Sequence, residues 1–354
     1  MSSSSTPFSD SKELEYPFGR SWAPTAGEPF EVYPGVFWLN MPIPIQLERI
    51  NLWLLRDGNT WTIVDTGIHD ESCKAVWQTV FDNFCPINSI KQIIVTHFHP
   101  DHLGLAEWLS TQADCPVLIS SDEYKAYKTV RSRKPDQFNP AVIDFCRLIG
   151  ADEKFQALYT KMGTPSNNPM LMPDRCQFID ESFKVTIGGI HWQAVKGNGH
   201  SPEHICLYAK KANLLISGDQ ALPRISSNIS LYIDNADQDP LHDWIASCEK
   251  LRDTVAPDVL VLPSHQEPFI GLPQRMQQLI DEHHSELDRL QESIQTSSEE
   301  PKTSVEISHI LFPQKLDAFV RMLAIGETLA HLRFLTNQKR LSMSTDDQGA
   351  LRFY

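Results

Sequence analysis

The chain has 354 residues, of which 41% are hydrophobic and 21% are charged, as in ordinary globular proteins. Its 31 basic and 45 acidic residues leave a net charge of −14, which disfavours a nucleic-acid partner because phosphates are neutralised by a basic face. No apolar run approaches the roughly 18 residues that a membrane helix needs, so we expect no membrane association.

The N-terminal stretch MSSSSTPFSD is polar and lacks the apolar segment of a secretory signal, so residues 1–29 are predicted to be a tail and lead-in. The seven cysteines are scattered, odd in number and without a CxxC motif. This pattern indicates reduced thiols and a cytoplasmic location rather than a disulfide framework. We expect most of the cysteines to be small buried side chains.

Residues 30–66 alternate in the manner of β-strands, and Asp57-Gly58-Asn59 is a turn signal between two apolar runs. Residues 70–84 have helical spacing. Residues 90–97 form a β-branched run bounded by polar residues, which predicts a buried strand. A helix and a short strand are expected next, at 103–112 and 115–120.

Residues 121–173 break this rhythm with helix-like pieces that end in a loop, which predicts an inserted helical cap. Strand signals resume downstream of the cap, at 176–180, 183–196, 205–219 and 259–265. Two strand-rich halves with helices outside them indicate a layered α/β protein.

The pattern changes again after Pro273, where apolar side chains at helical spacing predict a long amphipathic helix over 276–294. His283 and His284 on this helix are expected to lie on its solvated face. After a polar linker, two helical segments and a final turn suggest a small winged-helix-like unit. The apolar side chains of 320–335 suit either a homodimer interface or packing onto their own chain.

The segment Thr96–Gly104, THFHPDHLG, concentrates three histidines and one aspartate. Residues two apart on an extended chain face the same way, so His97 and His99 point together. Pro100 turns the chain, and Asp101 and His102 follow at the start of a helix, where a carboxylate is favoured. Imidazole and carboxylate ligands together suit zinc, or iron and manganese less specifically.

Three more potential ligands appear downstream, each close to the end of a predicted strand. His200 lies in GNGHSPEH, Asp219 in LLISGDQ and His265 in VLVLPSHQEP. Strand ends can deliver single side chains onto one edge of a sheet. The sequence therefore predicts that these residues join the THFHPDH segment in one metal site.

The motifs THFHPDH, VDTG, GHSPEH, SGD and PSH, in this order, resemble those of the metallo-β-lactamase superfamily, and the match spans roughly residues 30–272. The tail resembles that of the lactamase-beta-2-like branch, in which a winged-helix-like domain follows the hydrolase domain. The resemblance implies a four-layer αββα sandwich over 30–272, with the helical insertion at about 121–173. Residues 273–354 would form the small C-terminal domain.

The resemblance also implies a role for each matched residue. His97, His99 and His200 would hold one metal. Asp101, His102 and His265 would hold a second. Asp219 would bridge both. Asp65 of VDTG would orient a ligand without touching a metal, and His204 is expected to have a similar supporting or structural role.

All seven ligand positions are filled, which favours two zinc ions, with iron or manganese as alternatives, and hydrolysis over oxygen chemistry. The implied enzyme is a dinuclear hydrolase in which a hydroxide bridging the metals attacks a polarised substrate, while Asp101 takes or relays a proton. No serine or cysteine nucleophile is required.

Three residues are candidates for binding a small-molecule substrate, and each has an alternative interpretation. Arg224 follows the Asp219 motif and suits either a substrate carboxylate or phosphate, or a structural ion pair. Met41, with Ile43 and Ile45, suits either an apolar flap or the core. Tyr124 in the cap, like Tyr127 and Phe138, suits either the pocket lining or packing.

The leading functional hypothesis is hydrolysis of a small carbonyl substrate, namely a lactone, thioester, ester or β-lactam. An endoribonuclease or phosphodiesterase of the lactamase-beta-2 type is an alternative, against which the acidic balance and the acidic STDDQG turn argue. A thioesterase similar to glyoxalase II is a second alternative, although its basic helical tail is not matched here.

Overall fold

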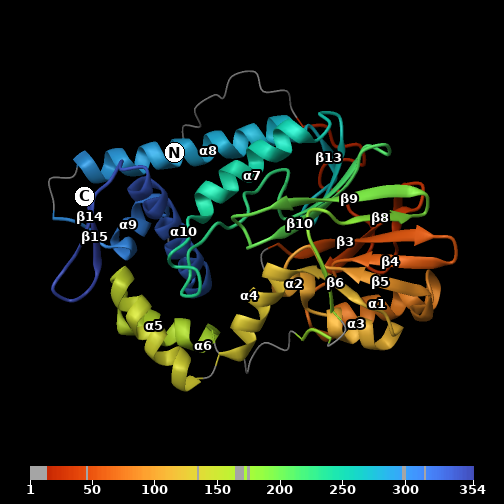
Figure 1. The fold of residues 1–354 in the computed structure, drawn as a ribbon, viewed down its shortest axis with the longest axis horizontal. Helices are drawn as coiled ribbons and strands as arrows, with labels where there is room; N and C mark the ends of the chain where they lie inside the picture. The colour runs from red at the N-terminus through yellow and green to blue at the C-terminus, as the bar shows by residue number, and fades with distance from the viewer. Residues whose placement is uncertain are drawn as a thin grey trace.

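The computed structural model describes residues 14–44, 47–133, 135–163, 171–173, 176–296, 300–314 and 316–354. Within these ranges the chain forms two large sheets, a two-stranded hairpin, and helices on the outside (Figure 1). Phe138 lies in a helix, but its side chain is outside the described part, and Ile45 is also outside it. Where described, no helix is both long and apolar enough to cross a membrane.

The first sheet has seven strands in sequence order, and its first four form an antiparallel meander. Strands β4 to β7 then run parallel, with connections that carry helices or the helical insertion. The strands are β1 (Phe30–Tyr33), β2 (Val36–Pro42), β3 (Arg49–Asp57), β4 (Thr60–Val64), β5 (Ile90–Ile94), β6 (Val117–Ser120) and β7 (Cys176–Ile179).

The second sheet has six strands in the order β13-β12-β11-β10-β9-β8, and all its pairs are antiparallel except β11 with β12. The strands are β8 (Lys184–Ile187), β9 (Ile190–Gly197), β10 (His204–Ala209), β11 (Leu214–Gly218), β12 (Leu260–Pro263) and β13 (Phe269–Ile270).

Helices cover the outer face of each sheet (Figure 1). On the first sheet lie α1 (Glu71–Asn83) and α3 (Ala106–Ala113), with the short helix α2 (Pro100–Leu103) and the 3₁₀ turn η1 (Ile87–Ser89) nearby. On the second sheet lie α7 (Pro240–Thr254) and α8 (Leu272–Thr296). The layer order is therefore helices, sheet, sheet, helices, which confirms the expected αββα sandwich.

Three apolar clusters fill the three interfaces of this sandwich. Between the sheets, Trp53 and Ile94 of the first pack with Trp192 and Ile216 of the second. Under α1 and α3, a second cluster includes Trp77, and a third includes residues of α7, α8 and the second sheet. Each buried side chain of this size contributes about 1.5–3 kcal/mol, so the burial holds the layers together and fixes the loops at their edge.

The helical insertion is present as α4 (Ser121–Ser132), α5 (Pro135–Ile149) and α6 (Glu153–Gly163). Its apolar side chains, Phe145 and Tyr159 among them, belong to the same cluster as Leu329 near the C-terminus. The insertion therefore packs against the C-terminal helices, and Figure 1 shows α5 and α6 beside them.

The C-terminal region comprises α9 (Ser304–Leu311), α10 (Ala318–Asn337) and the hairpin of β14 (Met343–Thr345) and β15 (Leu351–Phe353). Leu329, Leu332 and Leu335 of α10 are buried within their own chain. Packing onto the same chain accounts for this part of the apolar face, and a homodimer interface stays a prediction.

The expected long helix is present as α8, but the expectation for His283 is wrong. His283 is 2% exposed, whereas His284 is exposed as expected. The buried Met276 and Ile280, then His283, then the buried Leu287 follow one another at steps of three or four residues, so His283 lies on the apolar stripe. The sequence-based prediction placed His283 in solvent because histidine is a polar residue type.

Helix α7 was not singled out from the sequence, although its signals are present. Asp239 precedes it, and its side chain accepts a hydrogen bond from His242 N, while Pro240 occupies the first turn. Buried Trp244 and Cys248 then follow at helical spacing. This helix covers the second sheet beneath the loop that carries His200. In that loop a Cβ at Gly199 would lie 2.5 Å from Trp244 Cβ, so the loop packs closely on α7.

Candidate metal centre

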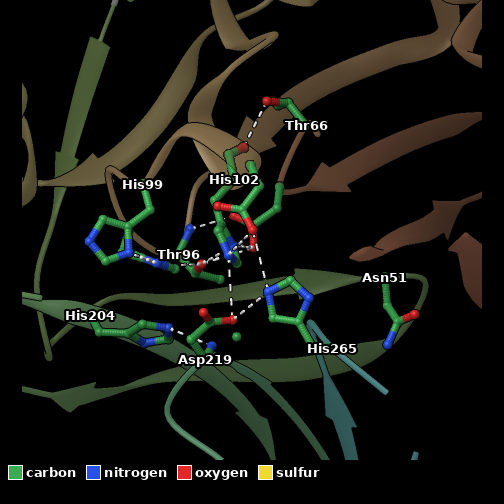
Figure 2. A network of polar contacts seen from close by, with 12 residues as sticks. Asn51, Thr66, Thr96, His99, His102, His204, Asp219 and His265 are labelled. Atoms are coloured by element: carbon green, nitrogen blue, oxygen red, sulfur yellow. Dashed lines mark hydrogen bonds and ion pairs between the residues drawn. The ribbon is translucent and has the colours of Figure 1, made fainter. Parts of the chain in front are cut away.

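The seven predicted ligands gather where strands of the two sheets end. Figure 2 labels four of them, namely His99, His102, Asp219 and His265. His97 and His99 follow β5, and Asp101 and His102 belong to α2. The other three come from the second sheet, where His200 lies between β9 and β10, Asp219 follows β11, and His265 follows β12. The sandwich therefore brings together side chains that are up to 168 positions apart, from His97 to His265.

The turn before the ligand segment is built around Asp65. This residue has a positive φ of 61°, an uncommon conformation for a non-glycine residue. Its carboxylate accepts hydrogen bonds from Thr96 N and Thr96 Oγ1, each at 2.8 Å, and from His102 Nδ1 at 2.8 Å. The chain after β5 is thus tied to the chain after β4, and the ring of His102 is oriented.

At Gly104, just after the short helix α2, neighbouring backbone approaches so closely that a side chain would not fit. A Cβ at Gly104 would lie 2.4 Å from Pro100 O and 2.7 Å from Gly67 O. The helix ends there, and α3 begins only at Ala106, three residues later than the sequence suggests. Pro100 opens α2 as expected and places Asp101 in its first turn.

The ligand atoms form overlapping groups whose members all lie within 4.8 Å of one another. One group is His97, His99 and His200, and another is Asp101, His102 and His265. His97, His102 and Asp219 form a third group that joins the first two.

Asp219 reaches both sets of ligands with its two carboxylate oxygens. Oδ2 lies 3.4 Å from His200 Nε2, while Oδ1 lies 3.4 Å from His102 Nε2 and 3.6 Å from His265 Nε2. Ligand atoms that share a cation through bonds of about 2.0–2.1 Å at near-tetrahedral angles lie roughly 3.3–3.4 Å apart. The spacing around Asp219 is therefore that of side chains arranged around cations.

Two polar atoms at the centre are buried and lack a hydrogen-bond partner among the described residues, namely His102 Nε2 and Asp219 Oδ1. Leaving a buried polar atom unpaired costs about 1–3 kcal/mol, so such atoms are rare unless they serve another purpose. Both atoms point at neighbouring ligands (Figure 2). Because His102 Nδ1 donates to Asp65, Nε2 of the neutral ring is an acceptor, and two orphaned acceptors fit divalent cations.

Burial and neighbouring charges shift the pKa values of several side chains in the cluster away from their usual values. Burial lowers the pKa of His97 well below its usual value, and the neighbouring histidines lower it further. Burial also disfavours the charged form of His102, but the surrounding carboxylates outweigh it and raise its pKa. Burial alone would raise the pKa of Asp219, yet His265 and His102 hold it well below its usual range. The carboxylate is therefore ionised and able to bind a cation.

His204 supports the centre and is not part of any ligand group. It is fully buried, and its Nε2 accepts a hydrogen bond of 3.1 Å from Asp219 N. Burial, followed by the charge of His200, lowers the pKa of His204, so the ring stays neutral and can accept this bond. His204 thus fixes the backbone of Asp219.

Glu123 and Asn51 also position the centre, and the sequence did not reveal either. The buried carboxylate of Glu123 accepts from Phe98 N at 2.9 Å and from Glu203 N at 2.7 Å, joining the loops of His99 and His200. Asn51 Nδ2 donates to Pro263 O at 2.9 Å, which ties the strand end before His265 to β3. Figure 2 shows Asn51 on the side of His265. The partners of Glu123 and Asn51 lie 25 to 212 residues away, beyond any local pattern.

Arg224 is engaged by its own chain. Its guanidinium donates to Glu267, a carboxylate whose side chain is only 1% exposed, and Arg49 approaches the same carboxylate at 3.3 Å. Arg224 also lies over the ring of Tyr16, 5.7 Å from its centroid. The geometry matches the structural ion pair considered above, and substrate binding by Arg224 stays a prediction.

The side chains of Met41 and Tyr124, the other two candidates for substrate binding, pack against other residues of the chain. Met41 has no exposed surface and belongs to the cluster under α1. Tyr124 is half-buried and packs against Phe178, with ring centroids 5.2 Å apart. A role for either residue in substrate binding stays a prediction.

This fold and this constellation of histidines and aspartates define a metal-dependent hydrolase. The chain belongs to the metallo-beta-lactamase superfamily, whose model matches residues 46–265. A second model, for the C-terminal domain of metallo-beta-lactamase-like proteins, matches residues 290–354. The resemblance to the superfamily and the presence of a C-terminal domain are therefore confirmed, and the winged-helix form of that domain stays a prediction.

Relatives of known structure or name agree with this assignment. A β-lactamase-domain protein from Burkholderia ambifaria shares 36% identity and a TM-score of 0.84, with 96% of each chain covered. A probable metallo-hydrolase of Bacillus subtilis, YqjP, is 23% identical over 87% of this chain and 94% of its own length. The acyl-coenzyme A thioesterase MBLAC2 of Gallus gallus is 22% identical over 66% of this chain and 79% of its own.

Proposed function

We propose that this protein is a dinuclear zinc hydrolase that acts on a small carbonyl substrate, namely a lactone, thioester, ester or β-lactam. The observation that carries the proposal is the position of Asp219, whose two carboxylate oxygens face two different sets of ligand atoms. A single carboxylate between two sets is what a pair of cations about 3.5–4 Å apart requires.

In this proposal His97, His99 and His200 would hold one ion and Asp101, His102 and His265 would hold a second, and Asp219 would be shared between them. Five imidazoles and two carboxylates favour zinc, while iron or manganese would accept the same donors. When bound, such ions supply Lewis acidity, which lowers the pKa of water and polarises a carbonyl group.

The protein's own residues position the reaction and move the proton. Asp101 retains 18% exposure of its side chain, and its Oδ2 lies 3.3 Å from His265 Nε2. Burial would raise the pKa of Asp101, but His102 and His265 hold it below its usual range. Asp101 is thus an ionised carboxylate at the solvent side of the centre, where it can accept or relay a proton.

A small substrate is favoured over nucleic acid by the charges of the C-terminal region. Arg340 is paired with Asp288 at 2.6 Å, and Arg352 with Asp346 at 2.8 Å. These arginines are neutralised within the chain, and the net charge is −14. The name of the relative MBLAC2, an acyl-coenzyme A thioesterase, makes thioesters the first class to examine.

The test is a substrate panel with the purified, zinc-loaded full-length chain. Lactones, acyl thioesters, simple esters and β-lactams are compared with phosphodiesters and RNA. We expect turnover of at least one carbonyl class, lost in His99→Ala and retained in His242→Ala, which changes an exposed histidine of α7 that belongs to none of the ligand groups. Turnover of phosphodiesters with an inert carbonyl panel would overturn the proposed substrate class.

A further inference from the structure

A second group of metal-ligand atoms lies between helices α8 and α10. It consists of His283 and Glu286 on α8 and His331 on α10, and it shares no residue with the candidate metal centre. His283 and Glu286 are three positions apart and therefore lie on one face of their helix. Glu327, four positions before His331, lies on the same face of α10.

The two histidines are buried without the partners that buried rings require. His283 is 2% exposed and His331 is 1% exposed. Among the described residues, no hydrogen-bond partner reaches either ring nitrogen of His283 or Nε2 of His331. Unpaired buried nitrogens are costly, and a cation beside Glu286 would complete two of these three, His283 Nδ1 and His331 Nε2.

Their arrangement around Glu286 repeats that of the candidate metal centre. Glu286 Oε2 lies 3.4 Å from His331 Nε2 and 3.7 Å from His283 Nδ1. Both distances exceed an ordinary hydrogen bond; the first falls within, and the second lies 0.1 Å above, the 3.4–3.6 Å that separate Asp219 from the histidines around it. They are close to the spacing of roughly 3.3–3.4 Å between ligand atoms that share one cation.

The ring of His331 is held in the orientation that a ligand needs. Its Nδ1 donates to the backbone carbonyl of Glu327 at 2.8 Å, because a carbonyl oxygen can only accept. In a neutral ring the proton is therefore on Nδ1, and the Nε2 lone pair faces Glu286. Metal-binding histidines use the same device, a backbone or carboxylate acceptor on the second nitrogen.

We propose that His283, Glu286 and His331 bind a divalent cation of the zinc class, which fastens α8 to α10. Two imidazoles and a carboxylate are a donor set that zinc uses. Glu286 retains 42% exposure of its side chain, which gives a cation a route from solvent.

This site is connected to the candidate metal centre through two residues. Asn228 Nδ2 donates to Glu327 Oε2 at 3.3 Å, and Asn228 O accepts from His200 Nδ1 at 2.9 Å. Fastening α10 to α8 would therefore restrain the segment that orients His200. The site is a positioning element in this role and takes no part in the reaction itself.

The test counts zinc in the full-length chain after zinc loading and removal of loosely bound metal. We expect His283→Gln to hold about one zinc ion per chain fewer than the wild type, and His284→Gln, its exposed neighbour, to hold the same number as the wild type. Equal zinc in the wild type and in His283→Gln, or equal losses in both variants, would overturn the proposal.

A second variant guards against misfolding, and a third separates this site from the candidate centre. Glu286→Gln is nearly isosteric and half-exposed, so it should fold, as circular dichroism will verify, and it should also lose about one ion. In a His99→Ala background, adding His283→Gln should still remove one further ion. A Glu286→Gln variant that folds and keeps every ion would refute the site, whatever the candidate centre binds.

Discussion

Asp65 and His102 form a fully buried pair in which the imidazole Nδ1 donates to the carboxylate at 2.8 Å, leaving Nε2 directed at Asp219 and Asp101. The same carboxylate binds both the amide and the hydroxyl of Thr96. One side chain thus sets the tautomer of a ligand and the path of the chain that carries two others.

The first prediction concerns Asp65→Asn. Asparagine tolerates the positive φ at this position, but it weakens the charge-assisted bond to His102. Loss of such a supporting partner typically lowers metal affinity by about 10–100-fold. Competition with a chromophoric chelator will measure zinc affinity, with Asp144→Asn, an exposed residue of α5, as the control. Unchanged affinity in Asp65→Asn would remove Asp65 from the support of the centre.

The second prediction uses two glycines that share a positive φ. Gly218 has a φ of 52°, and a Cβ there would lie 2.3 Å from His204 Nε2, whereas a Cβ at Gly58 meets nothing within 4 Å. Both alanine variants should lose about 1–2 kcal/mol of unfolding free energy from the backbone alone. Only Gly218→Ala should also lose zinc, since it displaces His204 and with it Asp219. Denaturation curves with metal analysis would refute this if both variants kept their zinc.

The third prediction decides between the two roles of Arg224. If the guanidinium serves mainly to neutralise the buried Glu267, Arg224→Gln should lower the unfolding free energy by about 1–3 kcal/mol and leave KM unchanged. Arg49 remains near Glu267, which limits the loss. Steady-state kinetics on whichever substrate the panel identifies, together with urea denaturation, will measure both. A tenfold rise in KM at unchanged stability would instead indicate a substrate contact.

The fourth prediction concerns the thiols. Burial raises the pKa of Cys85 and Cys248 to about 12, and that of Cys146 to about 11. Against an unfolded thiol near 8.5, the thiolate fraction at pH 8 falls by about a hundredfold or more, and only the thiolate reacts. Iodoacetamide at pH 8 should therefore label at most Cys176 quickly in the native chain, and all seven cysteines after denaturation. Rapid native labelling of several thiols would contradict this burial.

The sequence predicted what lies in short motifs and missed what depends on distant partners. The corner after β5 could be predicted, because the alternating imidazoles and the proline of THFHPDHLG determine the local geometry of the chain. The role of Glu123 could not be predicted, because the fold brings together the two backbone amides that donate to it. The start of α3 was placed three residues too early, at Leu103 instead of Ala106, and the close approach of backbone from two segments to Gly104 is likewise a contact made by the fold.

The burial of His283 was also mispredicted, although in this case the local pattern contained the signal. Its position on the apolar stripe of α8 was available from the spacing of Met276, Ile280 and Leu287, yet its residue type suggested solvent. What makes the position informative is His331, which is 48 positions away and reaches His283 only through the packing of α10 on α8.

The central claim is that the seven side chains between His97 and His265 hold two cations that share Asp219. Anomalous diffraction at the zinc absorption edge, from crystals of the zinc-loaded protein, tests it most directly. We expect two peaks about 3.5–4 Å apart on either side of the Asp219 carboxylate, each about 2 Å from its three other ligands. A single peak, or none within bonding distance of these side chains, would contradict the dinuclear centre.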